Sequence, residues 1–199
     1  MQLLVATTNA HKLSEIRSIL TGLDVDLVSL SDFPPVIVPD ETGDTFVANA
    51  REKALHYAAA TGQLTLAEDS GLEIDGLNGE PGVHSARFNG DSYPERFKVI
   101  YARLANAERL RCRARFVCAL VVVRGSNILF ETRGTVEGQV ANEPSGAAGF
   151  GYDPIFHYPP YGKTLAEVSR EEKTAVSHRG KAVRALRNYL ATNTALWET

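Results

Sequence analysis

Apolar positions change from strand-like to helix-like spacing within the first 22 residues. A short apolar run over residues 3–6 predicts a strand, and Asn9 after it is a residue type that commonly caps a helix. Apolar side chains then recur at helical spacing until Gly22, a typical helix stop: Leu13, Ile16, Ile19 and Leu20. The chain therefore opens with a predicted strand, a loop and a helix.

The next stretch predicts a helix followed by a strand. The helix is expected after Asp44-Thr45 and before Gly62, with an apolar face formed by Val47, Ala50, Ala54 and Ala58. Residues 64–67 then predict a strand that runs into an acidic turn, where Gly71 permits a sharp exit. Strands that alternate with helices favour an α/β sheet.

The second half of the chain predicts two long strands and a final helix. Residues 76–92 are rich in Gly, Asn, Asp and Pro and are expected to be loop, and a helix is expected over 96–107. Residues 115–123 and 128–136 are rich in β-branched and aromatic types, which predicts antiparallel strands joined by a hairpin turn at 124–127. The final helix places these apolar residues on one face: Ala182, Val183, Leu186, Tyr189 and Leu190.

Composition narrows the class of protein. The chain has 199 residues, of which 44% are hydrophobic and 23% charged, as in an ordinary globular domain. Its formal charge of -3 gives no electrostatic footprint for duplex DNA or an anionic membrane. The longest apolar run, residues 116–123, is far shorter than the about 18 residues that a membrane span requires. Two cysteines and an N-terminus without a basic leader favour a reducing, cytoplasmic setting.

The first candidate site is residues 7–12, where the first predicted strand meets its helix. Backbone amides at a helix N-terminus favour anions, and Lys12 adds a positive charge, so a phosphate would fit. The segment lacks the Gly-x-x-x-x-Gly-Lys spacing of a P-loop. Taken alone, it is more simply explained as a capped helix with a solvated lysine.

Two acidic segments form the second candidate. Glu68 and Asp69 follow an apolar strand, and two adjacent carboxylates there would repel each other, which a hard cation such as Mg2+ relieves. Asp40 and Glu41 lie in a loop before the second helix, so a carboxylate from each segment can share one octahedral Mg2+. The alternative for either pair is an acidic turn that faces water, and Lys53 nearby is by default a surface residue.

The third candidate is the glycine-rich segment 145–154. Its glycines do not have the spacing of a dinucleotide-binding fingerprint, and Pro154 stands where the helix should open. The segment instead presents Phe150 and Tyr152 next to Asp153, which suits stacking of a purine and hydrogen bonding to its edge. A packed glycine turn with core aromatic residues is the alternative.

The fourth candidate is residues 170–181, before and within the start of the final helix. Ser177 can cap that helix, so that His178 and Arg179 lie in its first turn. Cations oppose the helix dipole there, which favours a phosphate or base site over a solvated helix start. Residues 163–187 contain seven Lys or Arg against three Asp or Glu, so the modest total charge conceals a basic segment. The five histidines show no zinc spacing, and the sequence has no Gly-x-Ser-x-Gly elbow.

Taken in order, these blocks closely resemble the inosine/xanthosine triphosphate pyrophosphatase family, whose members hydrolyse deaminated purine nucleoside triphosphates. The resemblance covers nearly the whole chain and includes residues 7–12, 41–43, 69–72, 81–82, 85–87, 149–154 and 177–180. It implies an α/β fold in which residues 1–199 form a single domain with a long mixed β-sheet and two lobes flanking a substrate cleft. It also implies a homodimer.

The resemblance further implies a role for each matched residue. Asp69 would be the catalytic proton acceptor and would hold Mg2+ together with Glu41. The substrate-binding residues would be Thr7, Thr8, Asn9, Lys12, Lys53 and Ser70 at the triphosphate, and Phe150, Gly151, Tyr152, Asp153, Lys173, His178 and Arg179 at the nucleoside. Glu68 departs from the aspartate of many relatives and lengthens the side chain by one methylene.

The expected reaction is attack of water on the α-phosphorus of ITP, dITP or XTP, which gives the monophosphate and pyrophosphate. Donor-only groups such as Arg179 or Lys173, aimed at the 6-oxo group of the base, would reject ATP. The expected partners are small-molecule purine nucleoside triphosphates, with no nucleic acid and no membrane. The sequence leaves two alternatives open, a pyrophosphatase for modified pyrimidine or other triphosphates and a nucleotide-binding sensor that never turns its ligand over.

Overall fold

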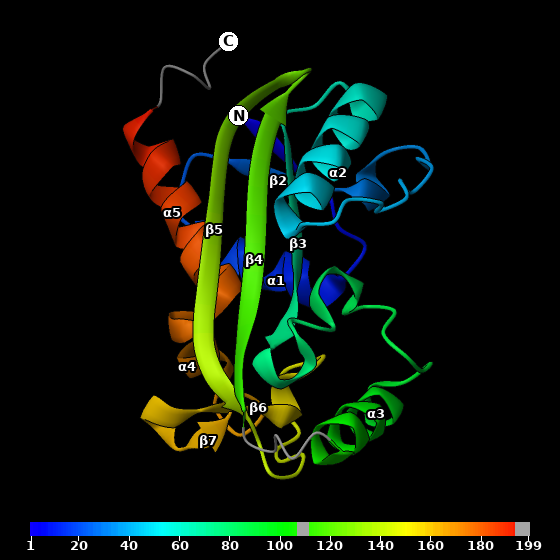
Figure 1. Ribbon diagram of the computed structural model, residues 1–199. Helices are drawn as coiled ribbons and strands as arrows, with labels where there is room; N and C mark the ends of the chain where they lie inside the picture. The colour runs from blue at the N-terminus through cyan, green and yellow to red at the C-terminus, as the bar shows by residue number, and fades with distance from the viewer. Residues whose placement is uncertain (107–111, 194–199) are drawn as a thin grey trace. The chain divides into compact units, whose positions relative to one another are not determined.

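The computed structural model describes residues 1–106 and 112–193, and the strands in this part of the chain form one mixed sheet (Figure 1). In spatial order they are β2 (Asp26–Ser29), β1 (Gln2–Val5), β3 (Thr65–Ile74), β4 (Arg113–Arg124), β5 (Asn127–Val140), β6 (Phe156–Tyr158) and β7 (Lys163–Thr164). β1 pairs in parallel with β2 and β3, whereas the β5–β6 and β6–β7 pairs are antiparallel. The α/β class and the long mixed sheet expected from the sequence are thus confirmed.

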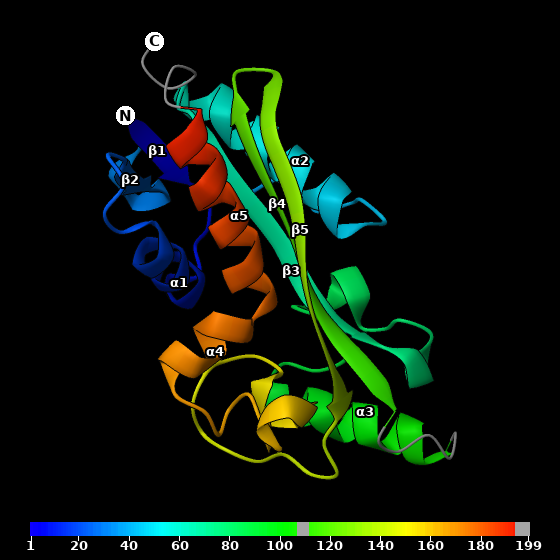
Figure 2. The same cartoon turned by 90° about the vertical axis from the view of Figure 1, so that its left-hand side faces the viewer.

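The chain forms two compact units, and β3, β4 and β5 contribute residues to both. Unit 1 contains residues 1–69, 118–134 and those from His178 onward. In this unit α1 (Ala10–Leu20) and α5 (His178–Thr192) pack together on one face of the strands, and α2 (Phe46–Thr61) lies on the other (Figure 2).

The helix boundaries in unit 1 confirm the capping residues expected from the sequence. Asn9 caps α1 through its side-chain oxygen, which accepts hydrogen bonds from two backbone N–H groups. The hydroxyl of Thr45 caps α2 by accepting a hydrogen bond from the backbone N–H of Ala48, and Gly62 ends the helix in the left-handed conformation with φ of 69°. The buried face of α2 begins at Phe46 rather than at Val47, which is only half-buried.

The alternation of side chains along β3 decides what each of its residues contacts in unit 1. The core beneath α1 and α5 is formed by Leu3, Val5, Ile16, Leu20, Leu66, Leu120, Val122, Val183, Leu186 and Leu190. Because strand side chains alternate between faces, Glu68 lies on the same face as Leu66, toward α1 and α5. Asp69 lies on the other face, toward α2.

Unit 2 contains residues 70–117 and 135–177 and includes α3 (Tyr93–Asn106) and α4 (Arg170–Val176). Its core is formed by residues of β3, α3, β4, β5, the loop before β6, and β6: Leu72, Ile74, Phe97, Ile100, Leu104, Phe116, Val140, Tyr152 and Phe156. The expected helix over 96–107 begins at Tyr93, and Ala107 lies outside the described residues. No helix among the described residues is long and apolar enough to cross a membrane.

The acidic turn expected after residues 64–67 is wrong, because β3 continues without interruption to Ile74. Gly71 serves close approach rather than a sharp exit. A Cβ atom at Gly71 would lie 2.3 Å from the Oγ of Ser85 and 2.5 Å from the carbonyl oxygen of Gly82. Ser85 Oγ in turn accepts a hydrogen bond of 2.9 Å from the backbone N–H of Leu72.

Gly134 of β5 determines how closely the start of α5 approaches the sheet. A Cβ atom at this position would lie 2.1 Å from the carbonyl oxygen of His178 and 2.8 Å from the backbone nitrogen of Ala182. We therefore expect Gly134→Ala to lower the free energy of unfolding by about 1–3 kcal/mol, the usual cost of overpacking. A Gly-to-Ala change in a strand is otherwise stabilising, so the sign measured by urea unfolding tests the contact directly.

Gly125, in the turn before β5, provides the matched control. It has φ of 57°, and a Cβ atom there would have no neighbour within 4 Å. Asparagine tolerates this left-handed conformation, so Gly125→Asn should change the free energy of unfolding by less than about 0.5 kcal/mol. Equal losses in the two variants would contradict the steric explanation.

Candidate active site

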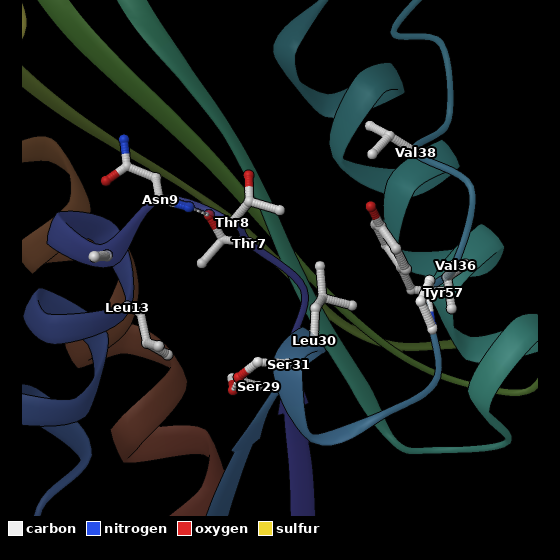
Figure 3. A pocket seen from close by; sticks show the side chains of 12 residues that line it. Thr7, Thr8, Asn9, Leu13, Ser29, Leu30, Ser31, Val36, Val38 and Tyr57 are labelled. Carbon is white, nitrogen blue, oxygen red and sulfur yellow. Dashed lines mark hydrogen bonds between the residues drawn. The ribbon is translucent and has the colours of Figure 1, made fainter.

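The loop between β1 and α1 lines a pocket of unit 1 with a volume of about 420 Å³. Thr7, Thr8 and Asn9 lie on one side of it, and Val38 of the loop before α2 and Tyr57 of α2 lie opposite (Figure 3). One wall therefore carries hydroxyl and amide groups, while the other is largely apolar. Three of the residues expected to hold a triphosphate thus line a pocket.

The first turn of α1 offers fewer free amides than an uncapped helix would. The Oδ1 atom of Asn9 accepts hydrogen bonds from the backbone N–H groups of His11 and Lys12, at 2.9 and 3.2 Å. An anion bound here would therefore depend on side-chain donors, such as the hydroxyl of Thr8 and the ammonium group of Lys12. This refines the expectation that the helix N-terminus itself supplies the donors.

Glu68 stands at the centre of a buried group of charges beneath α1 and α5. Its Oε1 atom lies 2.6 Å from Lys12 Nζ and 3.4 Å from Arg179 Nη2. The other terminal nitrogen of Arg179 lies 2.6 Å from the Oε2 atom of Glu15, and Cys118 Sγ donates to Glu68 Oε2 at 3.3 Å. Burial alone would raise the pKa of Glu68, but the charges of Arg179 and Lys12 hold it well below its usual range.

Asp69 meets a different environment on the opposite face of β3. Its Oδ2 atom accepts a hydrogen bond of 3.1 Å from Asn49 Nδ2. Burial raises the pKa of Asp69, and the nearby charge of Glu41 adds to this, although Lys53 and the Asn49 hydrogen bond act in the opposite direction. Lys53 forms an ion pair with Glu41 and donates to the carbonyl oxygen of Glu68 at 3.3 Å.

The charge of Glu68 contributes to the raised pKa of Asp69, as the expected repulsion between adjacent carboxylates requires, but the two residues lie in a regular strand and not in a turn. The strand directs their carboxylates to opposite faces. Burial raises the pKa of Asp69, whereas the charges of Arg179 and Lys12 outweigh burial at Glu68 and lower its pKa. Two titratable groups treated in this way are suited to different roles. Glu68 is a permanent anion that fixes two cations, whereas Asp69 is a carboxylate with a raised affinity for a proton.

Glu41 and Asp69 remain a suitable pair of ligands for a hard cation. Both carboxylates lie within the electrostatic influence of Lys53, one on a loop and the other on β3. The described residues contain no group of three or more His, Cys, Asp or Glu side chains that could hold a metal ion. Mg2+ commonly binds through one or two carboxylates together with substrate phosphates and water, so this pair fits it.

In unit 2, Asp153 holds together the segment expected at the base. Its Oδ2 atom accepts a hydrogen bond of 2.7 Å from the backbone N–H of Phe150 and lies 2.6 Å from Lys173 Nζ. The same ammonium group lies 4.2 Å from the centre of the Phe150 ring. A Cβ atom at Gly149, where φ is 72°, would lie only 2.2 Å from Asp153 Oδ2, so the tight loop requires glycine there.

Tyr152 is a core residue of unit 2 rather than an exposed stacking platform. Its side chain is buried, its hydroxyl donates to the carbonyl oxygen of Ser85 at 2.8 Å, and Tyr93 packs against its ring edge to face. Of the two aromatic residues expected to stack on a purine, Phe150 is the one whose side chain is only half-buried. Any contact of Tyr152 with a ligand would therefore involve its backbone.

His178 and Arg179 begin α5, as the sequence predicts, and both are buried. The anions that compensate Arg179 are the protein's own carboxylates, Glu15 and Glu68. The phosphate or base expected at this helix start is therefore not required to explain the charge. The sequence-predicted residues divide between the units as follows: Thr7, Thr8, Asn9, Lys12, Glu41, Lys53, Asp69, His178 and Arg179 in unit 1, and Ser70, Phe150, Gly151, Tyr152, Asp153 and Lys173 in unit 2.

Sequence reasoning missed Glu15 and Asn49, both of which contact predicted site residues. Each is a polar residue buried on the inner face of a helix, which is the signal that could have identified it. Their partners could not be named from the sequence, because Glu15 and Arg179 are 164 positions apart.

Comparison with known proteins gives a consistent result. The model of the Ham1 family matches residues 3–189 of the chain. A dITP/XTP pyrophosphatase of an Exiguobacterium species (strain ATCC BAA-1283 / AT1b) is 46% identical over 187 residues, which cover 94% of this chain and 95% of that protein. The structure of a HAM1 protein from Coxiella burnetii superimposes with a TM-score of 0.89 at 38% identity, over 96% of this chain and 99% of that one. A nucleoside-triphosphatase / dITP/XTP pyrophosphatase from Mycobacterium abscessus gives a TM-score of 0.76 at 41% identity, covering 94% and 97%.

The opposite environments of Glu68 and Asp69 predict opposite effects of neutralising them. Glu68→Gln leaves the charges of Lys12 and Arg179 without their shared anion, so we expect a loss of about 3–5 kcal/mol in the free energy of unfolding at pH 7. Asp69→Asn removes a carboxylate that burial disfavours, and the amide oxygen can still accept from Asn49. We expect its stability to be within about 1 kcal/mol of the wild type, or higher. Urea unfolding of both variants measures the difference.

The pH dependence gives a second measurement of the same contrast. The pKa of Glu68 is lowered on folding, so its contribution is complete above its unfolded value of 4.5 and is lost as the pH falls toward the folded value. The gap between the wild type and Glu68→Gln should therefore narrow below pH 4.5. The pKa of Asp69 is raised on folding, so its contribution has the opposite pH dependence: it is complete below the unfolded value of 3.8 and is lost as the pH rises toward the folded value. Equal losses of unfolding free energy in Glu68→Gln and Asp69→Asn at pH 7 would refute the opposite environments assigned to the two carboxylates.

Proposed function

The chain belongs to the Ham1 family, and we propose from this premise that it hydrolyses deaminated purine nucleoside triphosphates such as dITP, ITP and XTP. The products would be the nucleoside monophosphate and pyrophosphate. The observation that carries the proposal is the contrast between two adjacent residues of β3. Glu68 pairs with Lys12, which belongs to the segment 7–12 expected to hold the triphosphate, and Asp69 faces α2 with a raised pKa. The printed activity of the relatives supports the same reaction class.

In the proposed reaction, the oxygen of a water molecule attacks the α-phosphorus. The bond between the α-phosphorus and the oxygen that bridges to the β-phosphate breaks, and the water proton passes to Asp69. A carboxylate of raised pKa suits this acceptor role better than an exposed one. Glu41 and Asp69 are the residues that would hold Mg2+, which when bound supplies neutralising charge to the phosphate oxygens.

The remaining contacts follow from the geometry within each unit. Lys12 would bind the triphosphate from a position that Glu68 fixes, together with Thr8 and Lys53. In unit 2, Phe150 offers a ring face, and Lys173 is held beside it by Asp153 as a donor-only group suited to a 6-oxo purine. Arg179 holds Glu68 through an ion pair, and with His178 it stays a proposed contact of the base.

The proposal also includes the assignments that the sequence suggested for the whole chain. These are a single pyrophosphatase domain over residues 1–199, a cytoplasmic homodimer, and small-molecule nucleotides rather than nucleic acid as the partners. Sedimentation of the purified protein, with and without nucleotide, measures the oligomeric state directly.

A substrate panel with pyrophosphate detection tests the reaction. We expect release of pyrophosphate from ITP, dITP and XTP in the presence of Mg2+, and much slower release from ATP, GTP and dUTP. For ATP, whose 6-amino group would leave donors aimed at a 6-oxo group unpaired, the discrimination is worth a factor of about 10⁴ in favourable sites. A preference for dUTP would support a pyrimidine triphosphatase instead. Binding of ITP and Mg2+ without pyrophosphate release over hours would support a nucleotide sensor.

Asp69→Asn tests the assigned proton acceptor. We expect the variant to remain folded and to lose at least about 100-fold in turnover of the best substrate, the usual scale for loss of acid-base help. Turnover is measured at saturating nucleotide and Mg2+, with circular dichroism as the control for folding. A variant with near-normal kcat under these conditions would refute the role of Asp69.

A further inference from the structure

Asn49 occupies a position in α2 where the sequence pattern calls for an apolar residue. The buried face of the helix consists of Phe46, Asn49, Ala50, Ala54, Tyr57 and Ala58, and Asn49 is 0% exposed. A polar amide at such a position costs free energy unless both of its ends form hydrogen bonds. Asn49 satisfies this condition with two partners, Asp69 of the proposed active site and Gly43 on the loop that carries Glu41.

The two hydrogen bonds fix the orientation of the Asn49 amide. The backbone N–H of Gly43 lies 2.8 Å from one end of the amide, and because a backbone N–H can only donate, that end is the oxygen. The amide nitrogen therefore points to the other partner and donates to Asp69 Oδ2 at 3.1 Å. A rotation of the amide by 180° would place two donors face to face at Gly43 and two acceptors face to face at Asp69.

The contact at Gly43 brings the loop of residues 40–43 close to α2. A Cβ atom at Gly43 would lie 2.8 Å from Ala48 Cβ and 2.8 Å from Asn49 Oδ1, so the approach requires glycine. Glu41 lies two residues before Gly43 and forms an ion pair with Lys53. Lys53 lies one helical turn after Asn49 in α2. One side chain thus connects the strand that carries Asp69 to the loop that carries Glu41.

We propose that Asn49 is a positioning residue that holds the Asp69 carboxylate and the Glu41 loop in a fixed mutual arrangement. This inference deepens the proposed function and rests on the roles assigned there to Asp69 and Glu41. Asn49 acts through these residues and does not itself contact the nucleotide. Partners that orient ligating carboxylates typically account for 10- to 100-fold in metal affinity or activity.

Exchanging the side chains of Asn49 and Asp69 tests whether the hydrogen bond between them, and not only the burial of a polar group, stabilises the protein. Asn49→Asp keeps an acceptor for Gly43 but directs a carboxylate at Asp69, so we expect the melting temperature to fall by about 4–8 °C. In the double variant N49D/D69N, the amide of the new side chain at position 69 can donate to the new carboxylate at position 49. At least half of the lost melting temperature should then return. This measurement requires neither metal nor substrate, and it stands even if the single variant does not fold.

Kinetics of Asn49→Asp and Asn49→Ala test whether the arrangement serves the reaction. We expect kcat for the best substrate to fall by about 10- to 100-fold at saturating Mg2+, with the KM for nucleotide within about threefold of the wild type. Calorimetric titration of the nucleotide-free protein with Mg2+ should show weaker binding in both variants. The exchanged pair should stay inactive, because the carboxylate is then on α2 instead of β3.

His56→Ala is the matched control for loosening of the loop. The Nε2 atom of His56 lies 2.7 Å from the carbonyl oxygen of Ile37, so it joins the same helix to the same loop without contacting either carboxylate. Its kcat should remain within about twofold of the wild type.

Three results would overturn the assignment of Asn49. These are a double variant no more stable than N49D, an Asn49→Asp variant with unchanged kcat, or an equal loss of kcat in His56→Ala. A wild-type protein that releases no pyrophosphate from any triphosphate would instead refute the proposed function itself.

Discussion

The twofold alternation of side chains along β3 is the constraint on which the site depends. A strand that continues through Glu68 and Asp69 must direct the two carboxylates to opposite faces. One then lies beneath α1 and α5 among cations, and the other faces α2. A turn at the same residues would leave both carboxylates in water with similar proton affinities. The regular strand therefore produces the chemical difference between two neighbouring acids.

The cations around Glu68 explain a feature of the sequence that looked unfavourable. Arg179 lies in the first turn of α5, where the helix dipole opposes a positive charge. Glu15 of α1 and Glu68 of β3 both lie within ion-pairing distance of its guanidinium, so the helix start is neutralised from within the unit. The same carboxylate, Glu68, also pairs with the ammonium group of Lys12 in the first turn of α1.

Local sequence signals predicted most of the elements but not the contacts at the site. Asn9, Thr45 and Gly62 act within a few residues of the backbone groups they satisfy, so the helix ends could be derived from the sequence. The polar run from Glu68 to Ser70 was mistaken for a turn because buried polar residues in a strand depart from the usual apolar pattern. Glu15 pairs with Arg179, and Asn49 donates a hydrogen bond to Asp69. These partners lie far apart in the sequence, so no local pattern predicts the contacts.

The concentration of buried polar groups around one stretch of β3 is itself an argument for function. Isolated buried ion pairs contribute little net stability, and replacing them with apolar residues of similar volume is often neutral or stabilising. The ion pairs therefore contribute less to the free energy of unfolding than a well-packed apolar cluster would; they are formed by Glu15, Glu68, Lys12 and Arg179. Unit 1 also contains a large cluster of buried aliphatic side chains, so the chain does form such clusters. The charges retained here, against the energetic preference of the core, are best explained by what they hold in position, namely Lys12 in the first turn of α1 and the strand that carries Asp69 one residue away.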